Sequence, residues 1–152
     1  MAKNNQIRLW GFYPFCLIIP NNKKTEINIG KLNILIVEDD ILNQEVAASL
    51  LNSHKVVVVK NGIDAIKILE KENFDVVLMD IEMPEMNGLE TTKIIRDSES
   101  NVLDHNIPII AMTAHEDTED KDRFIKCGMN GYLSKPVISK KLFEVIHQVM
   151  NE

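Results

Sequence analysis

Four apolar runs in this sequence end in polar side chains whose types suit phosphoryl chemistry. The runs cover residues 34–37, 76–79, 109–112 and 132–134. The polar side chains at their ends are Glu38, Asp39, Asp40, Asp80, Thr113 and Lys135. Parallel strands bring such ends together at one edge of a sheet, the edge where doubly wound folds bind their ligands. Acids, a hydroxyl and an ammonium around one point indicate magnesium-dependent phosphoryl chemistry on Asp80.

Asp80 is the candidate nucleophile of this set. Its carboxylate ends an apolar run and can form an acyl phosphate, since covalent catalysis uses aspartate as well as serine or cysteine. Phosphoryl transfer otherwise needs an in-line donor and compensation for the charge on the phosphoryl oxygens. Lys135 can neutralise one of these oxygens, and the Thr113 hydroxyl can hydrogen-bond another.

The acids at the first run end can complete a metal site with Asp80. Magnesium prefers oxygen ligands, usually one or two carboxylates together with water and substrate phosphate. Asp39 and Asp80 can supply that pair, while Glu38 or Asp40 can act through a bound water. Taken singly, each acid is more often a helix cap or a solvated turn residue. Their coincidence with the other run ends is what favours a site.

The pattern between these residues predicts a doubly wound α/β domain. From residue 31 onward, apolar runs of strand length alternate with helical stretches. Uninterrupted Val, Ile and Leu runs are typical of parallel strands that have helices on both faces. In the first helical stretch Leu42, Val46 and Leu50 recur every four residues, the spacing of an amphipathic helix. We therefore expect a flavodoxin-like, five-stranded parallel sheet in the order 2-1-3-4-5 with helices on both faces.

The fourth helical stretch has the weakest apolar pattern. It has five acids between Glu116 and Asp122, and Phe124 and Ile125 are its only large apolar residues. Acids in a first turn favour the helix dipole, but few apolar side chains mean weak docking on the sheet. We expect this helix to be the element that moves most easily.

Residues 1–30 differ from the rest of the chain. They hold four of the eight aromatic residues, and their apolar stretch 9–19 is too short to span a bilayer. No small-residue cleavage site follows that stretch, which argues against a secretion signal. We divide the chain into residues 1–30, a tail or the remnant of a preceding domain plus a linker, and residues 31–152, the α/β domain.

The composition argues against several classes of protein. A net charge of −6 argues against nucleic-acid binding by the domain as a whole. Cys16 and Cys127 stand alone without metal-ligand spacing, and they fit a reducing compartment. We therefore expect a cytoplasmic protein without a direct nucleic-acid or membrane partner. No G-x-G-x-x-G follows the first apolar run, which argues against a dinucleotide-binding domain.

Residues 31–150 resemble the receiver domain of two-component response regulators. The matching segments are ILIVEDD, VVLMDIEMPEMNG, IIAMTAH and GYLSKP, at residues 34–40, 76–88, 109–115 and 131–136. The resemblance implies that Asp80 accepts a phosphoryl group from a histidine kinase or a histidine phosphotransfer protein. It implies a signalling domain rather than an enzyme, with no kinase core in this chain. The expected output is a downstream protein target, reached by a monomer or by a weak phosphorylation-dependent dimer.

The resemblance also assigns the ligands of a magnesium ion. Asp39 is similar to the direct ligand of the family, and Glu38 to its neighbour that acts through water. Asp80 and the backbone carbonyl of Glu82 complete the implied set. Receivers of hybrid histidine kinases often have Asn at the place of Asp40. The third carboxylate of this chain therefore leaves open which acids coordinate the metal directly.

Further implied roles concern the response to phosphorylation. Thr113 and Lys135 match the switch hydroxyl and the lysine of the family. Tyr132 matches the aromatic residue that turns inward when the hydroxyl moves to the phosphoryl group, which changes the face of the fourth helix and fifth strand. The bond before Pro136 is usually cis in such domains. His115 lies two residues beyond Thr113 and could tune the access of water to the acyl phosphate.

Several alternatives stay open beside a stand-alone receiver. Asn43 and Gln44 after the acids are similar to receivers of hybrid histidine kinases, so a C-terminal receiver fragment of such a kinase is the first alternative. A haloacid-dehalogenase-like phosphatase is a distant one, because those enzymes have a second Asp where this chain has Glu82. A binding module that has lost phosphorylation is a third, and the presence of all the site residues argues against it.

Overall fold

Strands and helices alternate along the part of the chain that the structure describes, residues 30–115 and 118–151 of a computed structural model. The strands are β1 (Asn33–Val37), β2 (Lys55–Val59), β3 (Val76–Asp80), β4 (Ile109–Thr113) and β5 (Gly131–Ser134). The helices are α1 (Ile41–Leu50), α2 (Gly62–Leu69), α3 (Gly88–Arg96), α4 (Thr118–Cys127) and α5 (Ser139–Met150). This order confirms the predicted alternation. None of the described helices is long and apolar enough to cross a membrane.

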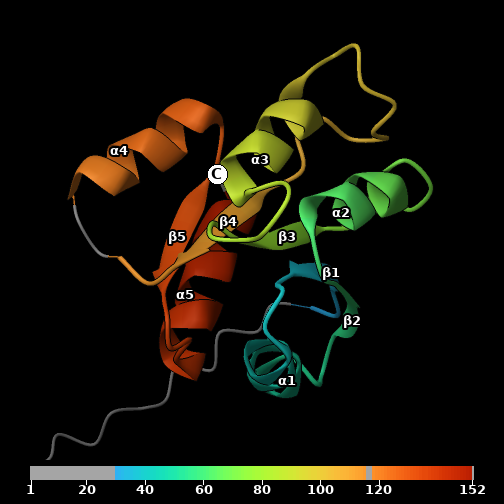
Figure 1. Cartoon of the computed structure of the whole chain (residues 1–152). Coiled ribbons are helices and arrows are strands. Elements are labelled where there is room, and N and C mark those ends of the chain that lie inside the picture. The colour runs from blue at the N-terminus through green and yellow to red at the C-terminus, as the bar shows by residue number, and fades with distance from the viewer. Residues whose placement is uncertain (1–29, 116–117, 152) are drawn as a thin grey trace, which may run out of the picture.

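The five strands form one parallel sheet in the order β2-β1-β3-β4-β5, which confirms the predicted fold and strand order. Helices α1 and α5 pack on one face of the sheet, and α2, α3 and α4 pack on the other (Figure 1). Strands β3 and β4 are buried along their whole length because helices cover both of their faces. Their sequences therefore read as continuous apolar runs instead of alternating ones.

Leu42 and Val46 of the apolar stripe of helix α1 lie away from the core, whereas Leu50 packs against it. Leu42 is 68% exposed and Val46 is 41% exposed, whereas Ala47 is buried. Asp40 fixes the start of the helix, because its side chain accepts a hydrogen bond from the Asn43 N–H at 2.9 Å. The four-residue period thus identified the helix correctly, but the small Ala47 packs on the sheet in place of Leu42 and Val46.

Several contacts fix the C-terminal end of α4. Phe124 is buried, while Ile125 is 55% exposed, in line with the sparse apolar pattern of this stretch. The chain leaves the helix through Gly128, whose φ of 100° is left-handed, and the Met129 N–H donates to the Phe124 carbonyl at 3.1 Å. Arg96 at the end of α3 donates from Nε to the Gly128 carbonyl at 2.9 Å. These bonds join the end of α4 to α3.

We expect Arg96→Ala to lower the free energy of unfolding by about 3 kcal/mol. The guanidinium donates to the carbonyls of Gly128, His105 and Ile107 at 2.9, 2.7 and 2.8 Å, and all three lose a charged donor in the variant. Urea unfolding measures the change. Lys93→Ala, at an exposed position of the same helix, should cost less than about 0.5 kcal/mol. An equal loss in both variants would contradict this role of the guanidinium.

Candidate functional site

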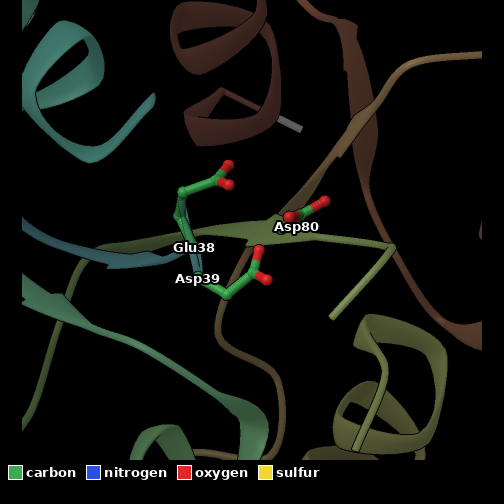
Figure 2. Close-up of side chains that lie close together, drawn as sticks. All are labelled: Glu38, Asp39 and Asp80. Atoms are coloured by element: carbon green, nitrogen blue, oxygen red, sulfur yellow. The ribbon is translucent and has the colours of Figure 1, made fainter. Parts of the chain in front are cut away.

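Two neighbouring strand ends bring three acids together. In the register of β1 and β3, Val37 lies opposite Met79, so Glu38 and Asp80 occupy the same edge of the sheet. Figure 2 shows Glu38 and Asp39 at the end of β1 beside Asp80 at the end of β3. Carboxylate oxygens of these three residues all lie within 4.8 Å of one another. The structure thus assembles an acidic cluster at the edge where the sequence predicted one.

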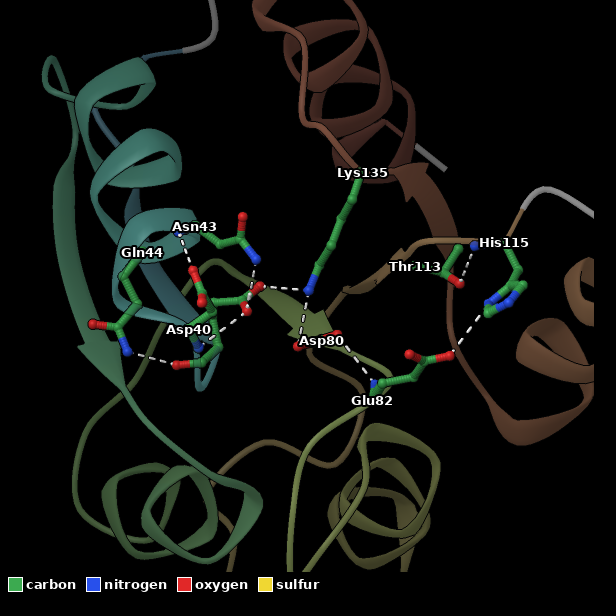
Figure 3. Close-up of polar contacts among 9 residues, drawn as sticks. Asp40, Asn43, Gln44, Asp80, Glu82, Thr113, His115 and Lys135 are labelled. Atoms are coloured by element: carbon green, nitrogen blue, oxygen red, sulfur yellow. Dashed lines mark hydrogen bonds and ion pairs between the residues drawn. The ribbon is translucent and has the colours of Figure 1, made fainter.

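Two carboxylates of this cluster are nearly inaccessible to solvent. Glu38 is 1% exposed and Asp80 is 2% exposed, whereas Asp39 lies open to solvent. Buried carboxylates this close need a cation, because each loses its hydration and repels the other. Lys135 supplies the cation, with Nζ at 2.8 Å from Glu38 Oε2 and 2.9 Å from Asp80 Oδ2 (Figure 3).

The shared lysine shapes the protonation of the site. Burial raises the pKa of Asp80 to about 6; the hydrogen bond from Lys135 opposes the rise, and the charge of Glu38 adds to it. Burial acts to lower the pKa of Lys135, but its hydrogen bonds to the two carboxylates outweigh that effect and the pKa is raised. Near neutral pH the site therefore combines an ionised Asp80 with an ammonium group. An ionised carboxylate is the form that can attack phosphorus or bind a cation.

The turn between β5 and α5 delivers Lys135 to the acids. The Lys135 N–H donates to the Thr113 carbonyl at 2.7 Å, which joins this turn to the end of β4. The Lys135–Pro136 bond is cis, as expected. On the opposite side, the loop after β3 lies close under Asp80. A Cβ at Gly88, the first residue of α3, would stand 2.2 Å from the Asp80 carbonyl oxygen, so this position has room only for glycine.

The start of α1 holds Glu38 in place. The Asn43 side chain donates to Glu38 Oε1 at 3.2 Å, and the Asp40 N–H donates to the same oxygen at 3.3 Å. Gln44 donates from Nε2 to the Glu38 carbonyl at 2.7 Å (Figure 3). The sequence identified Asn43 and Gln44 only as marks of a subfamily. Two amide side chains one helical turn after a pair of acids are the signal that could have indicated this contact.

Asp40 lies at the edge of the site as the N-cap of α1. Its carboxylate accepts the Asn43 N–H and lies outside the cluster of three acids. The geometry therefore separates the three consecutive acids of the sequence. Glu38 and Asp39 belong to the cluster with Asp80, and Asp40 begins the helix.

Thr113 and Tyr132 lie on the side of the sheet that α4 covers. Thr113 is 3% exposed, and its Oγ1 accepts the His115 N–H at 3.1 Å. Tyr132 lies opposite Ala111 on the neighbouring strand and packs with the core cluster of this side. Ala111 and Thr113 point to the same face because they are two residues apart on β4. Lys121 of α4 covers the Tyr132 ring, with Nζ at 4.8 Å from the ring centroid.

A contact between His115 and Glu82 lies at the entrance to the site. His115 Nδ1 lies 3.2 Å from Glu82 Oε1, and both side chains are exposed. The Glu82 N–H also donates to Asp80 Oδ1 at 3.1 Å, so the loop after β3 contacts both the buried acid and the loop after β4 (Figure 3). This places His115 beside the acidic cluster, where the sequence suggested it could act. The role predicted for the Glu82 carbonyl stays a prediction.

The fold and the site together define a class of protein. It is a doubly wound α/β domain in which a lysine joins two buried carboxylates at the carboxyl edge of the sheet. The family model of the response regulator receiver domain matches residues 34–147. The chain therefore belongs to the response regulator receiver domain family, a family of signalling modules, and the resemblance of its segments is confirmed.

Curated relatives of this chain are histidine kinases with a receiver segment of this kind. It is 35% identical to the probable histidine kinase 1 of Oryza sativa subsp. indica, over 80% of this chain and 16% of that protein. It is 36% identical to the sensor histidine kinase GacS of Pseudomonas protegens, over 86% of this chain and 15% of that protein. The chain thus spans less than a fifth of the length of these relatives.

Two solved structures are informative about the site. The receiver domain of the Pseudomonas aeruginosa sensor histidine kinase PA1611 is 33% identical, with a TM-score of 0.71 and coverage of 81% of this chain and all of that one. That structure has a magnesium ion coordinated in its active-site cleft. The second is a co-crystal structure from Saccharomyces cerevisiae of the phosphotransfer protein Ypd1 with the receiver domain of Ssk1. A chain of this complex is 33% identical, with a TM-score of 0.71 and coverage of 80% of this chain and 90% of that one.

The raised pKa of Asp80 gives a prediction about stability and pH. The pKa of Asp80 is about 6 in the folded protein, against an ordinary value of 3.8. The folded protein therefore binds the proton of the Asp80 carboxyl group more tightly than the unfolded chain does. Stability is therefore lost as the pH rises from about 4 to about 7. Asp80→Asn does not have this titrating group. We therefore expect the free energy of unfolding of Asp80→Asn, relative to that of wild type, to increase by about 2 kcal/mol as the pH rises from about 4 to about 7.

Urea unfolding in EDTA at a series of pH values measures the difference between the two proteins. Asp97→Asn, at an exposed carboxylate, is the matched control and should show no such trend. A difference between wild type and Asp80→Asn that stays constant with pH would contradict the assigned environment of Asp80.

Proposed function

We propose that this chain is the phosphoacceptor receiver of a two-component phosphorelay, in which Asp80 takes its phosphoryl group from a phosphohistidine. The observation that carries the proposal is the bridging position of Lys135 between Glu38 and Asp80, on a fold of the receiver family. The ammonium already stands where the charge of a phosphoryl group on Asp80 would develop. A cytoplasmic location, where phosphohistidine donors act, is part of this proposal.

The acidic cluster fits a magnesium ion. A hard cation of this size takes oxygen ligands and keeps several waters, and three carboxylates within 4.8 Å of one another offer such ligands from one side. We assign Asp39 and Asp80 as direct ligands with the Glu82 carbonyl, and Glu38 as a ligand through water. The magnesium ion in the cleft of the PA1611 receiver supports a magnesium ion at this site. When bound, the ion neutralises phosphoryl charge and orients the donor.

Several residues of the chain have separate roles in the phosphoryl transfer. An Asp80 oxygen forms the new bond to phosphorus while the bond from phosphorus to the donor imidazole nitrogen breaks, and that nitrogen keeps the electron pair. Lys135 turns from the Asp80 carboxylate to a phosphoryl oxygen without leaving Glu38. The Glu82 N–H, now 3.1 Å from Asp80 Oδ1, holds the acceptor in position. The exposed pair of Glu82 and His115 stands at the entrance and would tune the access of water to the product.

The proposed switch starts at Thr113. Its hydroxyl is buried at the end of β4 and would move to hydrogen-bond the phosphoryl group, which frees space for Tyr132 to turn inward on the same face of the sheet. Helix α4 covers this face and has Phe124 as its buried apolar anchor, so a small bias can displace it. A downstream protein would then recognise the face of α4 and β5. We propose a monomer or a weak dimer that forms on phosphorylation.

The first test is phosphorylation of the purified chain. Acetyl phosphate with magnesium should label wild type with a phosphoryl group that hydroxylamine releases, and Asp80→Asn should abolish the label. EDTA should abolish it too, because the acidic cluster then lacks its cation. Mass spectrometry after borohydride reduction locates the modified residue. Undiminished aspartyl labelling in Asp80→Asn would show that the acceptor is assigned wrongly.

The donor should dock beside the site on the exposed apolar face of α1, formed by Ile41, Leu42 and Val46, which are 65%, 68% and 41% exposed. This face begins directly after the acids, because Asp40 caps α1. Ile138, 66% exposed, follows the turn that carries Lys135 on the other side of the site. An in-line donor must come close to both. The complex of Ypd1 with a similar receiver supports a phosphotransfer protein as the partner.

We expect Leu42→Ala to slow transfer from phosphorylated yeast Ypd1 by about tenfold. Labelling by acetyl phosphate should stay unchanged, because the small donor does not need the apolar face. Quench-flow transfer assays with both donors separate the two effects. Leu103→Ala removes a leucine that is also exposed, at 52%, but lies in the loop after α3, and it should leave both rates unchanged. Equal loss with both donors would contradict docking on α1.

The receiver fragment of a hybrid kinase is the second candidate, and the similarity to histidine kinases favours it. It uses the same site and the same chemistry, so both candidates give the same result for Asp80. We keep residues 31–152 as the receiver unit. Residues 1–30 stay a proposed tail or remnant of a preceding domain with a linker, and residues 1–29 lie outside the described part of the chain. The phosphatase alternative gains no support from the family match.

A further inference from the structure

We propose that Lys121 is a positioning residue that holds the partly buried Tyr132 ring in place under α4 and thereby keeps α4 in its place in the unphosphorylated domain. This inference rests on the proposed relay from Thr113 to Tyr132. The juxtaposition that carries it is the Lys121 ammonium over the Tyr132 ring, 4.8 Å from the ring centroid. A lysine ammonium at this distance is attracted to the negative face of the ring.

The position of Lys121 on α4 is unusual for a lysine. It lies three residues before Phe124, which is buried, and Phe124 lies three residues before Cys127, whose Sγ donates to the Leu89 carbonyl of α3. Residues at this spacing share one face of a helix, so Lys121 stands on the core-facing stripe of α4. It is half-buried there, while Lys126 of the same helix is exposed. An apolar residue would be the ordinary choice at such a position.

Within the described part of the chain, the contact with the ring is the one interaction recorded for the Lys121 ammonium. Asp120 is a neighbour in sequence, but it pairs with Arg123 at 3.9 Å. Among residues 30–115 and 118–151, no carboxylate forms an ion pair with Lys121. The lysine therefore contacts Tyr132 although its helix is rich in acids, which is the arrangement expected of a side chain whose partner is the ring.

The two ends of α4 then have different attachments. Its C-terminal end is fixed by backbone bonds and by Arg96, which do not involve Tyr132. Lys121, nearer the N-terminal end, rests on a ring that can move, because its neighbour on β4 is the small Ala111. When Tyr132 turns toward Thr113, the contact with Lys121 is lost. The attraction thus opposes the switch, and phosphorylation must overcome it.

The Lys121–Tyr132 contact and phosphorylation of Asp80 oppose each other, and this coupling must act equally in both directions. Removing the charge of Lys121 should shift the population toward the inward position of Tyr132, the position that favours a phosphoryl group on Asp80. We expect Lys121→Gln to label about two- to fivefold faster with acetyl phosphate and magnesium. Lys121→Arg keeps a cation that stacks on the ring and should behave as wild type. Lys126→Gln makes the same charge change on the same helix and should have no effect.

A double-mutant cycle with Tyr132→Leu tests whether the ring is the partner. In the Tyr132→Leu background, Lys121→Gln should produce no further change in the labelling rate. A Lys121→Gln effect of undiminished size in that background would overturn the proposal, as would equal rates for Lys121→Gln and Lys126→Gln. Urea unfolding confirms that each variant is folded before its rate is used.

A second readout does not depend on phosphorylation. The chain has two tyrosines, so 3-fluorotyrosine gives two ¹⁹F resonances, and Tyr13→Phe assigns that of Tyr132. This resonance should shift in Lys121→Gln but not in Lys126→Gln. An unchanged resonance in Lys121→Gln would overturn the contact itself. If wild type fails to label on Asp80, the proposed function is wrong, while the ¹⁹F result still decides whether Lys121 positions the ring.

Discussion

The structure depends on one ammonium group shared by two buried carboxylates. Glu38 and Asp80 stand on adjacent strands, where water is excluded and two unpaired negative charges would oppose folding. Lys135 compensates both, but only if the turn after β5 reaches across the end of β4 to the end of β1. The order of the strands, the register of β1 with β3 and the path of this turn are therefore constrained by a single contact.

Local patterns were enough to predict the sheet and the place of the site. Strands covered on both faces have uninterrupted apolar runs, and the polar residues that end those runs had to meet at one edge. The sequence could not predict which face of α1 is buried, because Ala47 packs on the sheet for reasons of space that a period does not express. It left the place of Asp40 among the three consecutive acids open, because an aspartate can equally cap a helix or join an acidic cluster. The contacts of Arg96 and of Lys121 join segments far apart in sequence, and nothing local indicates them.

Rigid and adjustable parts lie next to each other in this domain. Backbone bonds and an arginine fix the end of α4, whereas its preceding turns rest on a partly buried ring and one apolar anchor. The acids at the other side of the sheet are held more firmly, because Asn43 and the start of α1 hold Glu38 independently of Lys135. Glu38 therefore has two hydrogen-bond donors besides the Lys135 ammonium.

The start of α3 and the loop before it differ in how much space they leave for side chains, because Gly88 approaches Asp80 closely. Any side chain at position 88 would push against the main chain of the acceptor itself, while Glu82 and Pro84 face solvent without such a restriction. The path of the backbone is therefore restricted where Gly88 passes Asp80. Substitutions at Glu82 or Pro84 can therefore change the surface beside the site and leave the main chain of Asp80 in place.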